Sequence, residues 1–381
     1  MHLTAAILMF LASVSGPETT RSASLRRPLP GLAPQVSELA PDRLRLAIAD
    51  ASDRVLVLVV QTGEIRAACA GAEGRPVSVS WRPDGQRLAV SDRSGEVRVF
   101  DAAGGSLVKR FSTAPIRDSA GYELRVVRYA VGGRVLVAAL GTPAEFFHAD
   151  GGARFARVTL APDVRISALA VSCDGALVAL GDADGRVGVW DARTGERVHG
   201  PIRVPRGTEE LGVHSLDFHP DGRSLAIGGG DCTARIWRLD EPEPTRQFSH
   251  CDQDVFGGLA IGNVRFSPDG TRLLTSSYSW WETRLWDVAS ERRLGGHECM
   301  FGNPGPSSAS FTAAGRFAVV AIGGIVLDSK DGSRRHTLEP VPDFRSARYR
   351  SGGGIAWSVR GGSLRVCEVG SGLPILERAT E

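Results

Sequence analysis

One supersecondary unit recurs along the chain, and this recurrence constrains the fold more than any other feature of the sequence. The clearest copy runs from Val264 to an Asp-Gly turn at Gly270, then through a second apolar stretch to Leu285-Trp286-Asp287. The turn glycine and the aromatic residue are 15 residues apart in three copies (85 to 100, 175 to 190, 222 to 237) and 16 apart in a fourth (270 to 286). Such constant spacing predicts a structural repeat rather than two or three separate domains.

Each copy is predicted to contain four short antiparallel strands. Asp-Gly turns and turns such as Thr194-Gly195 accept the positive φ that tight hairpins need. Four strands without an intervening helix cannot bury both faces of their sheet alone, but copies stacked around an axis can. We therefore predict an all-β fold: a single β-propeller of four-stranded antiparallel blades, with eight units counted and seven blades as the alternative.

Three motifs carry a resemblance to a known family. Phe266 to Gly270 reads Phe-Ser-Pro-Asp-Gly, Trp-Asp occurs at 190–191 and 286–287, and Gly296-His297 closes the sixth unit. These motifs resemble the WD40-repeat β-propeller family, with degenerate repeats of the bacterial type. The resemblance implies four-stranded blades around a central channel. It also implies that His297 joins a hydrogen-bonded network with the Ser/Thr and Asp of its blade.

The amino terminus differs from the repeats. We expect residues 1–34 to be a signal-like segment and a flexible linker, and 35–381 to be the propeller. The apolar run 5–12 is of signal-peptide length and is too short for a bilayer span, which needs about 20 apolar residues. No Lys or Arg precedes this run, so two locations stay open: export to the periplasm through residues 1–15, or the cytoplasm.

Most aromatic residues of the repeat are expected to fill the space between neighbouring blades. They stand at the end of the first or third predicted strand of a unit, where large rings pack against the next sheet. The residues concerned are Trp81, Trp190, Phe218, Trp237, Phe266, Trp286, Phe311 and Tyr349.

A second set of aromatic residues falls outside the repeat pattern. Tyr278, Trp280 and Trp281 occupy the turn between the second and third strands of unit six, where other units carry Gly and Asp. The loops that enter units six and seven lie on the same predicted face and contribute Phe256, Met300 and Phe301. Exposed Trp and Met residues tend to mark interfaces. These six residues are the candidate partner-binding site, and the alternative is that the loops bury the indoles locally.

No motif points to catalysis or to a cofactor. The chain lacks G-x-S-x-G, a P-loop and H-E-x-x-H, and its six cysteines form no C-x-x-C pair. A metal site of His250, Cys251, His297 and Cys299 is conceivable, but nothing in the sequence fixes their distances, and no metal is expected. A net charge of only +2 gives no electrostatic reason to expect nucleic-acid binding.

The sequence leaves two hypotheses for the function, each belonging to a different class of protein. The resemblance implies a non-catalytic, monomeric scaffold whose loops bind a protein or peptide, although a fold alone does not fix a function. The alternative is a quinoprotein-like or lactonase-like enzyme, or a small-ligand binder, that uses the channel mouth. That alternative predicts polar residues on many first strands, where only His214 and Asn263 stand out.

Overall fold

The computed structural model describes most of the chain after residue 31. The described ranges are 32–70, 74–113, 126–139, 143–207, 212–250, 260–277, 282–297, 309–312, 314–320, 325–338, 350–352, 355–360, 363–371 and 374–379.

The described residues form eight four-stranded antiparallel sheets, each made from four consecutive strands. We call the sheets blades 1 to 8 and number them in chain order. Blades 1 to 4 contain β1 (Leu32–Leu39), β2 (Arg45–Asp50), β3 (Val55–Val59), β4 (Ile65–Cys69); β5 (Pro76–Trp81), β6 (Arg87–Asp92), β7 (Glu96–Asp101), β8 (Leu107–Ser112); β9 (Val126–Ala130), β10 (Val135–Ala139), β11 (Ala144–His148), β12 (Arg154–Val158); β13 (Ile166–Val171), β14 (Leu177–Asp182), β15 (Arg186–Asp191), β16 (Arg197–Arg203). Blades 5 to 8 contain β17 (Val213–Phe218), β18 (Ser224–Gly229), β19 (Thr233–Arg238), β20 (Arg246–Ser249); β21 (Ile261–Phe266), β22 (Arg272–Ser277), β23 (Thr283–Asp287), β24 (Arg293–His297); β25 (Ala309–Phe311), β26 (Phe317–Val320), β27 (Ile325–Asp328), β28 (Arg334–Thr337); β29 (Arg350–Gly352), β30 (Ile355–Arg360), β31 (Ser363–Glu368), β32 (Pro374–Ala379).

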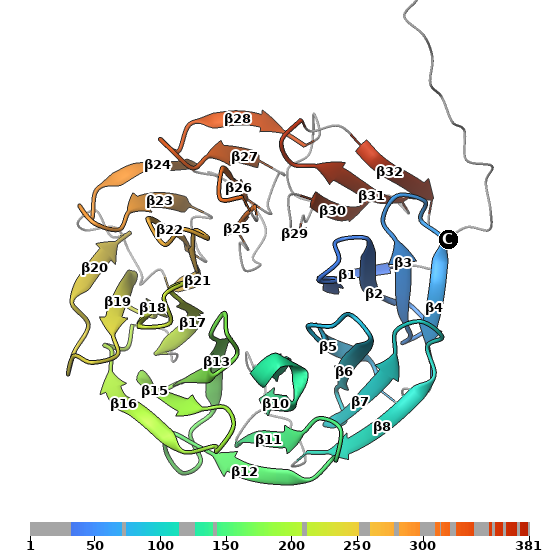
Figure 1. Cartoon of the computed structure of the whole chain (residues 1–381). Helices are drawn as coiled ribbons and strands as arrows, with labels where there is room; N and C mark the ends of the chain where they lie inside the picture. Colours follow the sequence, from blue (N-terminus) through green and yellow to red (C-terminus); the bar gives the residue numbers. More distant parts are fainter. Residues whose placement is uncertain are drawn as a thin grey trace, which may run out of the picture.

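The blades are arranged in a ring around a central axis (Figure 1). The first strand of each blade lies nearest the axis and the fourth lies at the periphery. First strands contact one another from blade to blade, from β1 to β5 and onward to β29, and β1 also contacts β30 of blade 8. The prediction of an eight-bladed β-propeller is therefore confirmed, and the seven-bladed alternative is set aside.

Burial differs between the strands of a blade in the way the sequence pattern predicts. The second strands are apolar runs buried on both faces, as in β2, where only Arg45 is partly exposed. The fourth strands are mostly exposed, as in β8, where only Phe111 is fully buried. In blades 1, 2, 4, 5 and 6 the pairing of the first two strands shifts register near the start of the first strand. The irregularity is one extra residue on the first strand in blades 2, 4, 5 and 6, where it is copied along with the sequence motif, and it is larger in blade 1.

Aromatic residues fill the seams between blades, as expected for their positions in the repeat. Trp237 of blade 5 is 1% exposed and packs in one cluster with Val187 and Val189 of blade 4. Trp190 of blade 4 packs in the same way with Phe146 of blade 3. The remaining expected core residues are Trp81, Phe218, Phe266 and Trp286, which are buried, Phe311, which is half-buried, and Tyr349, which lies outside the described residues.

The ring closes by packing blade 8 against blade 1 without exchange of a strand. Leu364 and Val366 of blade 8 form one buried cluster with Leu46, Leu56 and other residues of blade 1. Both terminal blades are complete four-stranded sheets drawn from their own part of the chain. The seam therefore depends on apolar side chains rather than on strand pairing.

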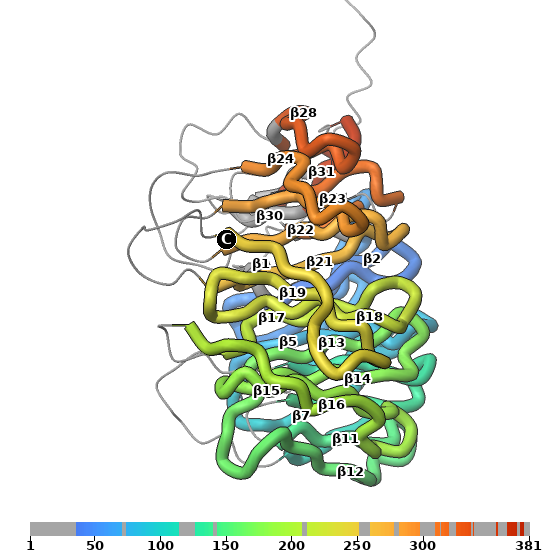
Figure 2. Tube along the Cα trace, turned by 90° about the vertical axis from the view of Figure 1, so that its left-hand side faces the viewer, coloured from blue at the N-terminus to red at the C-terminus, as the bar shows by residue number. Residues whose placement is uncertain are grey.

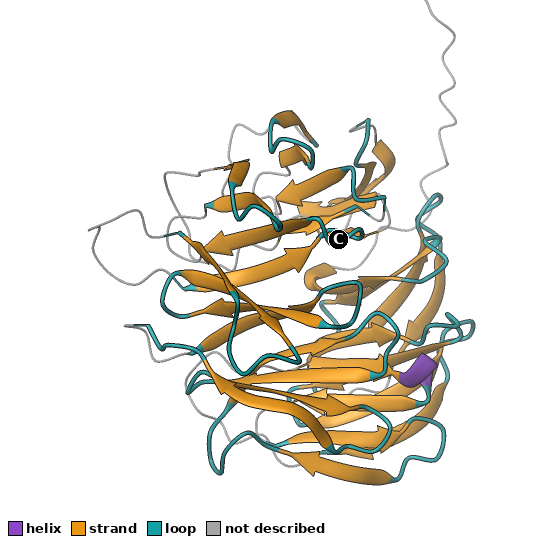
Figure 3. Cartoon of the chain, turned by 60° about the vertical axis from the view of Figure 1, so that its left-hand side comes forward, coloured by secondary structure: helices purple, strands orange, loops and turns teal. Residues whose placement is uncertain are grey.

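Helical structure is almost absent from the described residues. The one helical segment is a short turn of 3-10 type, η1 (Val131–Gly133), between β9 and β10 (Figure 3). None of the described segments is a helix with the length and apolar character needed to cross a bilayer. The first strand, β1, begins at Leu32, just ahead of the expected domain boundary at residue 35.

Candidate functional site

The ring has two faces that differ in the connections they carry. Seen edge-on, the strands run across the thickness of the ring from one face to the other (Figure 2). One face, which we call the turn rim, carries the turns between first and second strands and between third and fourth strands. The opposite face, the loop rim, carries the turns between second and third strands and the segments that join successive blades.

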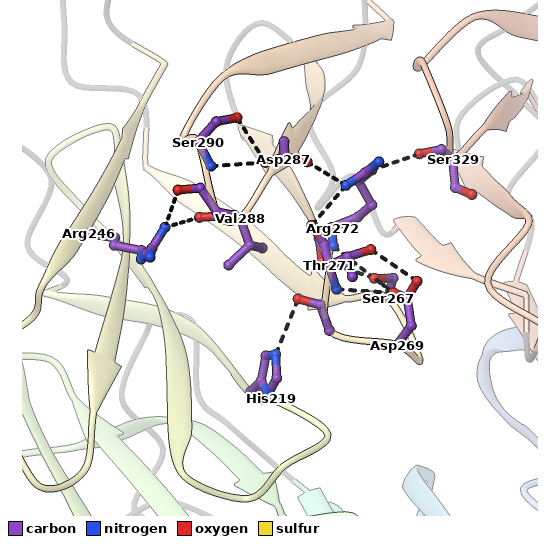
Figure 4. Close-up of polar contacts among 12 residues, drawn as sticks. His219, Arg246, Ser267, Asp269, Thr271, Arg272, Asp287, Val288, Ser290 and Ser329 are labelled. Atoms are coloured by element: carbon purple, nitrogen blue, oxygen red, sulfur yellow. Dashed lines mark hydrogen bonds and ion pairs between the residues drawn. The ribbon is translucent and has the colours of Figure 1, made fainter.

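The turn rim is held by side chains that reach backbone carbonyls of the next blade. In Figure 4, His219 of blade 5 donates from Nε2 to the Gly270 carbonyl of blade 6 at 3.2 Å. Arg246 of blade 5 donates to the carbonyls of Val288 and Ala289 in blade 6. These contacts tie the turns of neighbouring blades together.

An arginine on the turn rim of blade 6 forms an ion pair within its own blade and also donates to a backbone carbonyl of blade 7. Arg272 donates to the Asp287 carboxylate at 2.6 Å and to the Ser329 carbonyl of blade 7 at 3.2 Å (Figure 4). In blade 2, Arg87 and Asp101 form the equivalent ion pair at 3.0 Å. The polar side chains of these turns are thus already engaged within the protein.

On the loop rim, buried carboxylates organise the turns between second and third strands. Asp182 is fully buried, and its Oδ1 accepts the backbone N–H groups of Asp184 (2.9 Å) and Arg186 (2.8 Å). Asp92 is equally buried and pairs with the buried Arg98 at 2.6 Å. A carboxylate at this position closes its own turn, because it satisfies backbone donors that would otherwise lack partners.

In blade 6 the equivalent residue at the end of the second strand is Ser277, and the carboxylate comes instead from Glu282, which directly precedes β23 and contacts residues from several strands. Its Oε1 accepts from Nε of Arg284 at 2.6 Å and lies 3.1 Å from Nη2 of Arg293. Its Oε2 lies 3.4 Å from Nδ1 of His250, the residue that follows β20 of blade 5. Glu282 and His250 are 7% and 4% exposed, so the cluster is buried beneath the loop rim.

A hydrogen-bonded chain continues from His250 into the blade. Its Nε2 lies 2.6 Å from Oγ1 of Thr275, and the indole Nε1 of Trp286 donates to the same oxygen at 2.8 Å. The hydrogen-bonded network of blade 6 thus contains His250 of the preceding blade, Thr275 and Trp286, whereas the expectation named His297. The expectation placed on His297 is not tested in this way, although His297 pairs with Thr283 across β23 and β24.

The charge states of the cluster follow from its surroundings. Burial acts to raise the pKa of Glu282, but hydrogen bonds from His250 and Arg284 outweigh it and lower the pKa to about 2. Burial lowers the pKa of His250, and the nearby Arg284 charge acts in the same direction. At neutral pH, Glu282 is thus ionised between two guanidinium groups and the imidazole is neutral.

The six candidate partner-binding residues, Phe256, Tyr278, Trp280, Trp281, Met300 and Phe301, all lie outside the described residues. The described ends of their segments nevertheless come together in blade 6. His250 precedes 251–259, and Glu282 follows 278–281, and these two side chains are 3.4 Å apart. His297 precedes 298–308 and is the strand partner of Thr283. The described residues that flank the three segments therefore lie near one another on the loop rim of blade 6.

The structure shows the state of some cysteines, and it leaves two of the four candidate metal ligands outside the described residues. Cys232, in the turn between β18 and β19, is disulfide-bonded, whereas Cys69 is a buried free thiol and Cys173 an exposed one. Cys251 and Cys299 lie outside the described residues. Within the described residues, no group of three or more His, Cys, Asp and Glu side chains is placed to hold a metal ion.

The channel side of the first strands carries polar groups that connect blades. Asn263 is 6% exposed, and its Nδ2 donates to the Ala309 carbonyl of blade 7 at 2.9 Å. Ser215 Oγ accepts the N–H of Val264 in blade 6 at 3.2 Å. His214, the other candidate named for the channel, is half-buried on β17. Asn263 is therefore engaged in holding the ring.

These features define the class of the protein as an eight-bladed β-propeller with a clamped turn rim and a loop rim organised by buried carboxylates. Comparison with family models adds the type of repeat. The model of the WD domain, G-beta repeat, matches residues 158–191 and 200–238, and the Anaphase-promoting complex subunit 4 WD40 domain model matches 45–131. These parts of the chain are therefore similar to WD40 repeats. Each G-beta match begins in the outer strand of one blade and ends at the third strand of the next.

Several curated proteins are similar to parts of the chain. WD repeat-containing protein 1 of Gallus gallus is 26% identical over 213 residues, which cover 53% of this chain and 33% of that protein. The Guanine nucleotide-binding protein subunit beta of Nicotiana plumbaginifolia is 31% identical, over 32% of this chain and 31% of its own length. Coronin-7 of Rattus norvegicus is 30% identical, over 40% of this chain and 17% of its own length. The chain thus matches a third or less of each of these relatives.

Proposed function

We propose that this protein is a non-catalytic scaffold that binds a protein or peptide on the loop rim around blade 6. The observation that carries the proposal is that the described residues flanking three chain segments lie near one another, with His250 and Glu282 in contact beneath the loop rim. A rigid base beneath a binding surface reduces the entropy lost when a partner is bound. One relative, the guanine nucleotide-binding protein subunit beta, is by its name a subunit of a larger assembly, which supports the same role.

Within that surface we propose Tyr278, Trp280, Trp281, Phe256, Met300 and Phe301 as the contacting residues. Tryptophan, tyrosine and methionine provide large apolar area and are enriched at interface cores. The opposite face favours this choice, because its polar turn side chains are engaged in ties such as Arg272 to Asp287.

The test compares capture by three forms of the full chain. The wild-type protein, the double variant W280A/W281A and the control L44A are immobilised, and proteins retained from a lysate of the native host are quantified by mass spectrometry. Leu44 is a suitable control because it is 54% exposed and lies on the turn rim. We expect the double variant to lose a defined set of proteins that wild type and L44A retain, with an unchanged unfolding temperature.

Two results would contradict this assignment. Equal capture by all three forms would show that the two indoles are not part of the interface. A fall of many degrees in the unfolding temperature of W280A/W281A would show that the pair is core, since truncating a buried aromatic costs about 3–5 kcal/mol.

We also propose that the protein is exported. The apolar run 5–12 and the disulfide at Cys232 support this location, because disulfides persist in oxidising compartments. Mass spectrometry of the protein from its native host tests it through the mature amino terminus and through alkylation of thiols before reduction. An intact residue 1 together with an alkylated Cys232 would place the protein in the cytoplasm.

A further inference from the structure

We propose that His250 is a pH-sensitive latch between blades 5 and 6, which is closed while its imidazole is neutral and is released by protonation. The side chain is wholly buried and comes from the end of blade 5, whereas its polar contacts are all in blade 6. It therefore holds the end of one blade against the second and third strands of the next.

The hydrogen-bonded chain fits the neutral imidazole. Trp286 Nε1 can only donate, so the Thr275 hydroxyl accepts from it and is free to donate its own proton to Nε2 of His250. If Nε2 carried a proton, the hydroxyl would have to turn away from the imidazole. Its remaining acceptor is the Arg284 carbonyl at 3.5 Å, a length at which a hydrogen bond is weak. Protonation therefore reverses the short hydrogen bond, since the Thr275 oxygen must then accept from Nε2, and it leaves the hydroxyl proton with only this weak acceptor.

Burial lowers the pKa of His250, and the Arg284 and Arg293 charges act in the same direction, which together outweigh the opposite effect of Glu282. In blade 6 the imidazole faces the Glu282 carboxylate. That carboxylate already forms ion pairs with two cations, Arg284 at 2.6 Å and Arg293 at 3.1 Å. A protonated His250 would be a third cation against a single anion. Burial of an incompletely compensated charge is costly, because water no longer solvates it.

The blade 5 side adds no net charge to this balance. The turn that receives the His250 backbone N–H, at the Cys232 carbonyl (2.9 Å), contains Asp231. Asp231 is paired with Arg235 at 2.6 Å, so the two charges compensate each other. Acid therefore acts on the latch chiefly through the imidazole and its blade 6 neighbours.

The coupling to pH follows from the two states of the latch. Once opened, the imidazole is solvated and titrates near its ordinary pKa of about 6.5. In the closed latch the pKa is lower, so below pH 6.5 the open form binds the proton more readily. The population of the open form then rises by up to about tenfold for each pH unit. Between pH 7 and pH 5 the seam between blades 5 and 6 should loosen while the other seams do not.

Hydrogen exchange on the full chain tests the latch directly. Amide protection is measured by mass spectrometry at pH 7 and pH 5 and is corrected for the intrinsic exchange rate. We expect β22 and β23 to lose more than tenfold protection at pH 5, whereas β14 in blade 4 keeps its protection. The variant H250Q should lose this pH dependence, and H199Q, at a half-buried position of blade 4, should behave as wild type.

Equal protection of β22 at the two pH values, or the same loss in H250Q, would overturn the proposal. If H250Q does not fold, proton NMR of the wild-type histidines decides: the latch requires one imidazole that stays neutral well below pH 6.5, and its absence refutes the latch. A pH effect on partner binding would rest on the proposed function, because 251–259 and 278–281 adjoin the latch. Capture at pH 7.5 tests the scaffold alone, so the two proposals fail separately.

Discussion

The carboxylate of Asp217 in blade 5 accepts a hydrogen bond of 2.8 Å from the backbone N–H of Phe266 in blade 6. The same kind of tie occurs between blades 1 and 2, where Glu38 accepts from the N–H of Trp81 at 3.0 Å. Arg265 lies 3.8 Å from Asp217 and donates to the Leu216 carbonyl. Charged side chains of the inner strands thus join neighbouring blades.

Removal of the Asp217 tie should destabilise the ring. D217A leaves the Phe266 N–H without its acceptor, and an unsatisfied buried donor costs about 1–3 kcal/mol. D217N keeps an acceptor oxygen and should cost less. Burial also raises the pKa of Asp217, so its contribution to stability increases as the pH falls toward 3.8, and D217N should lack that increase. Urea unfolding at several pH values measures both effects, and equal stability of D217A and wild type would contradict the first.

Glu282 should make the protein sensitive to acid. Its pKa is about 2 in the folded protein against 4.5 for the free side chain, so its contribution to stability is complete above pH 4.5. That contribution is lost as the pH falls from 4.5 toward 2. E282Q should therefore unfold more easily at pH 6 and show a flatter decline in acid, as measured by urea unfolding. E64Q, at an exposed turn position, is the control and should follow wild type. An unchanged acid decline in E282Q would refute the role of this carboxylate.

Substitution of two glycines on the turn rim should distinguish the effect of backbone strain from the effect of steric crowding. Gly222 and Gly270 occupy equivalent turns with φ of +69° and +74°, where a residue with a Cβ is strained by roughly 1–2 kcal/mol. A Cβ at Gly222 meets nothing within 4 Å, whereas one at Gly270 would lie 2.1 Å from Nε2 of His219. G270A should therefore lower the unfolding temperature more than G222A. If the two variants have the same unfolding temperature, the His219 contact contributes nothing to the stability of the seam.

The closing seam should respond to loss of its apolar side chains. Leu56 is 1% exposed in the cluster shared by blades 1 and 8, and truncation of a buried leucine costs about 2–5 kcal/mol. L56A should show this loss in denaturant unfolding. L44A in the same blade removes an exposed side chain and should stay within about 0.5 kcal/mol of wild type. Similar stability of the two variants would mean that the seam does not limit unfolding.

The fold was predictable because its signals are local and repeated. Each Asp-Gly turn fixes a hairpin, and the constant distance to residues such as Trp190 and Trp286 reports one sheet after another. Rings at those positions are buried between blades because a four-stranded sheet has no other way to cover its faces. The count of eight blades followed from the same spacing, including the weaker copies at both ends of the chain.

The buried cluster of blade 6 was not predictable to the same extent. Its members Thr275, Glu282 and Arg293 are ordinary residues in the sequence, and only the pairing of β22, β23 and β24 brings them together. The turn aspartate of other blades, such as Asp182, is replaced by Ser277 in blade 6, so the sequence pattern did not mark Glu282 as the buried carboxylate of this turn. The six aromatic and methionine positions nearby remain a prediction, since they lie outside the described residues.

The absence of strand exchange at the seam has a consequence for how such a ring can be rearranged. Every sheet is drawn from one continuous run of chain, so a circular permutant that starts between any two blades keeps all its hydrogen-bonded strand pairs. The same modularity means that duplication or loss of a whole unit leaves the internal pairing of its neighbours intact.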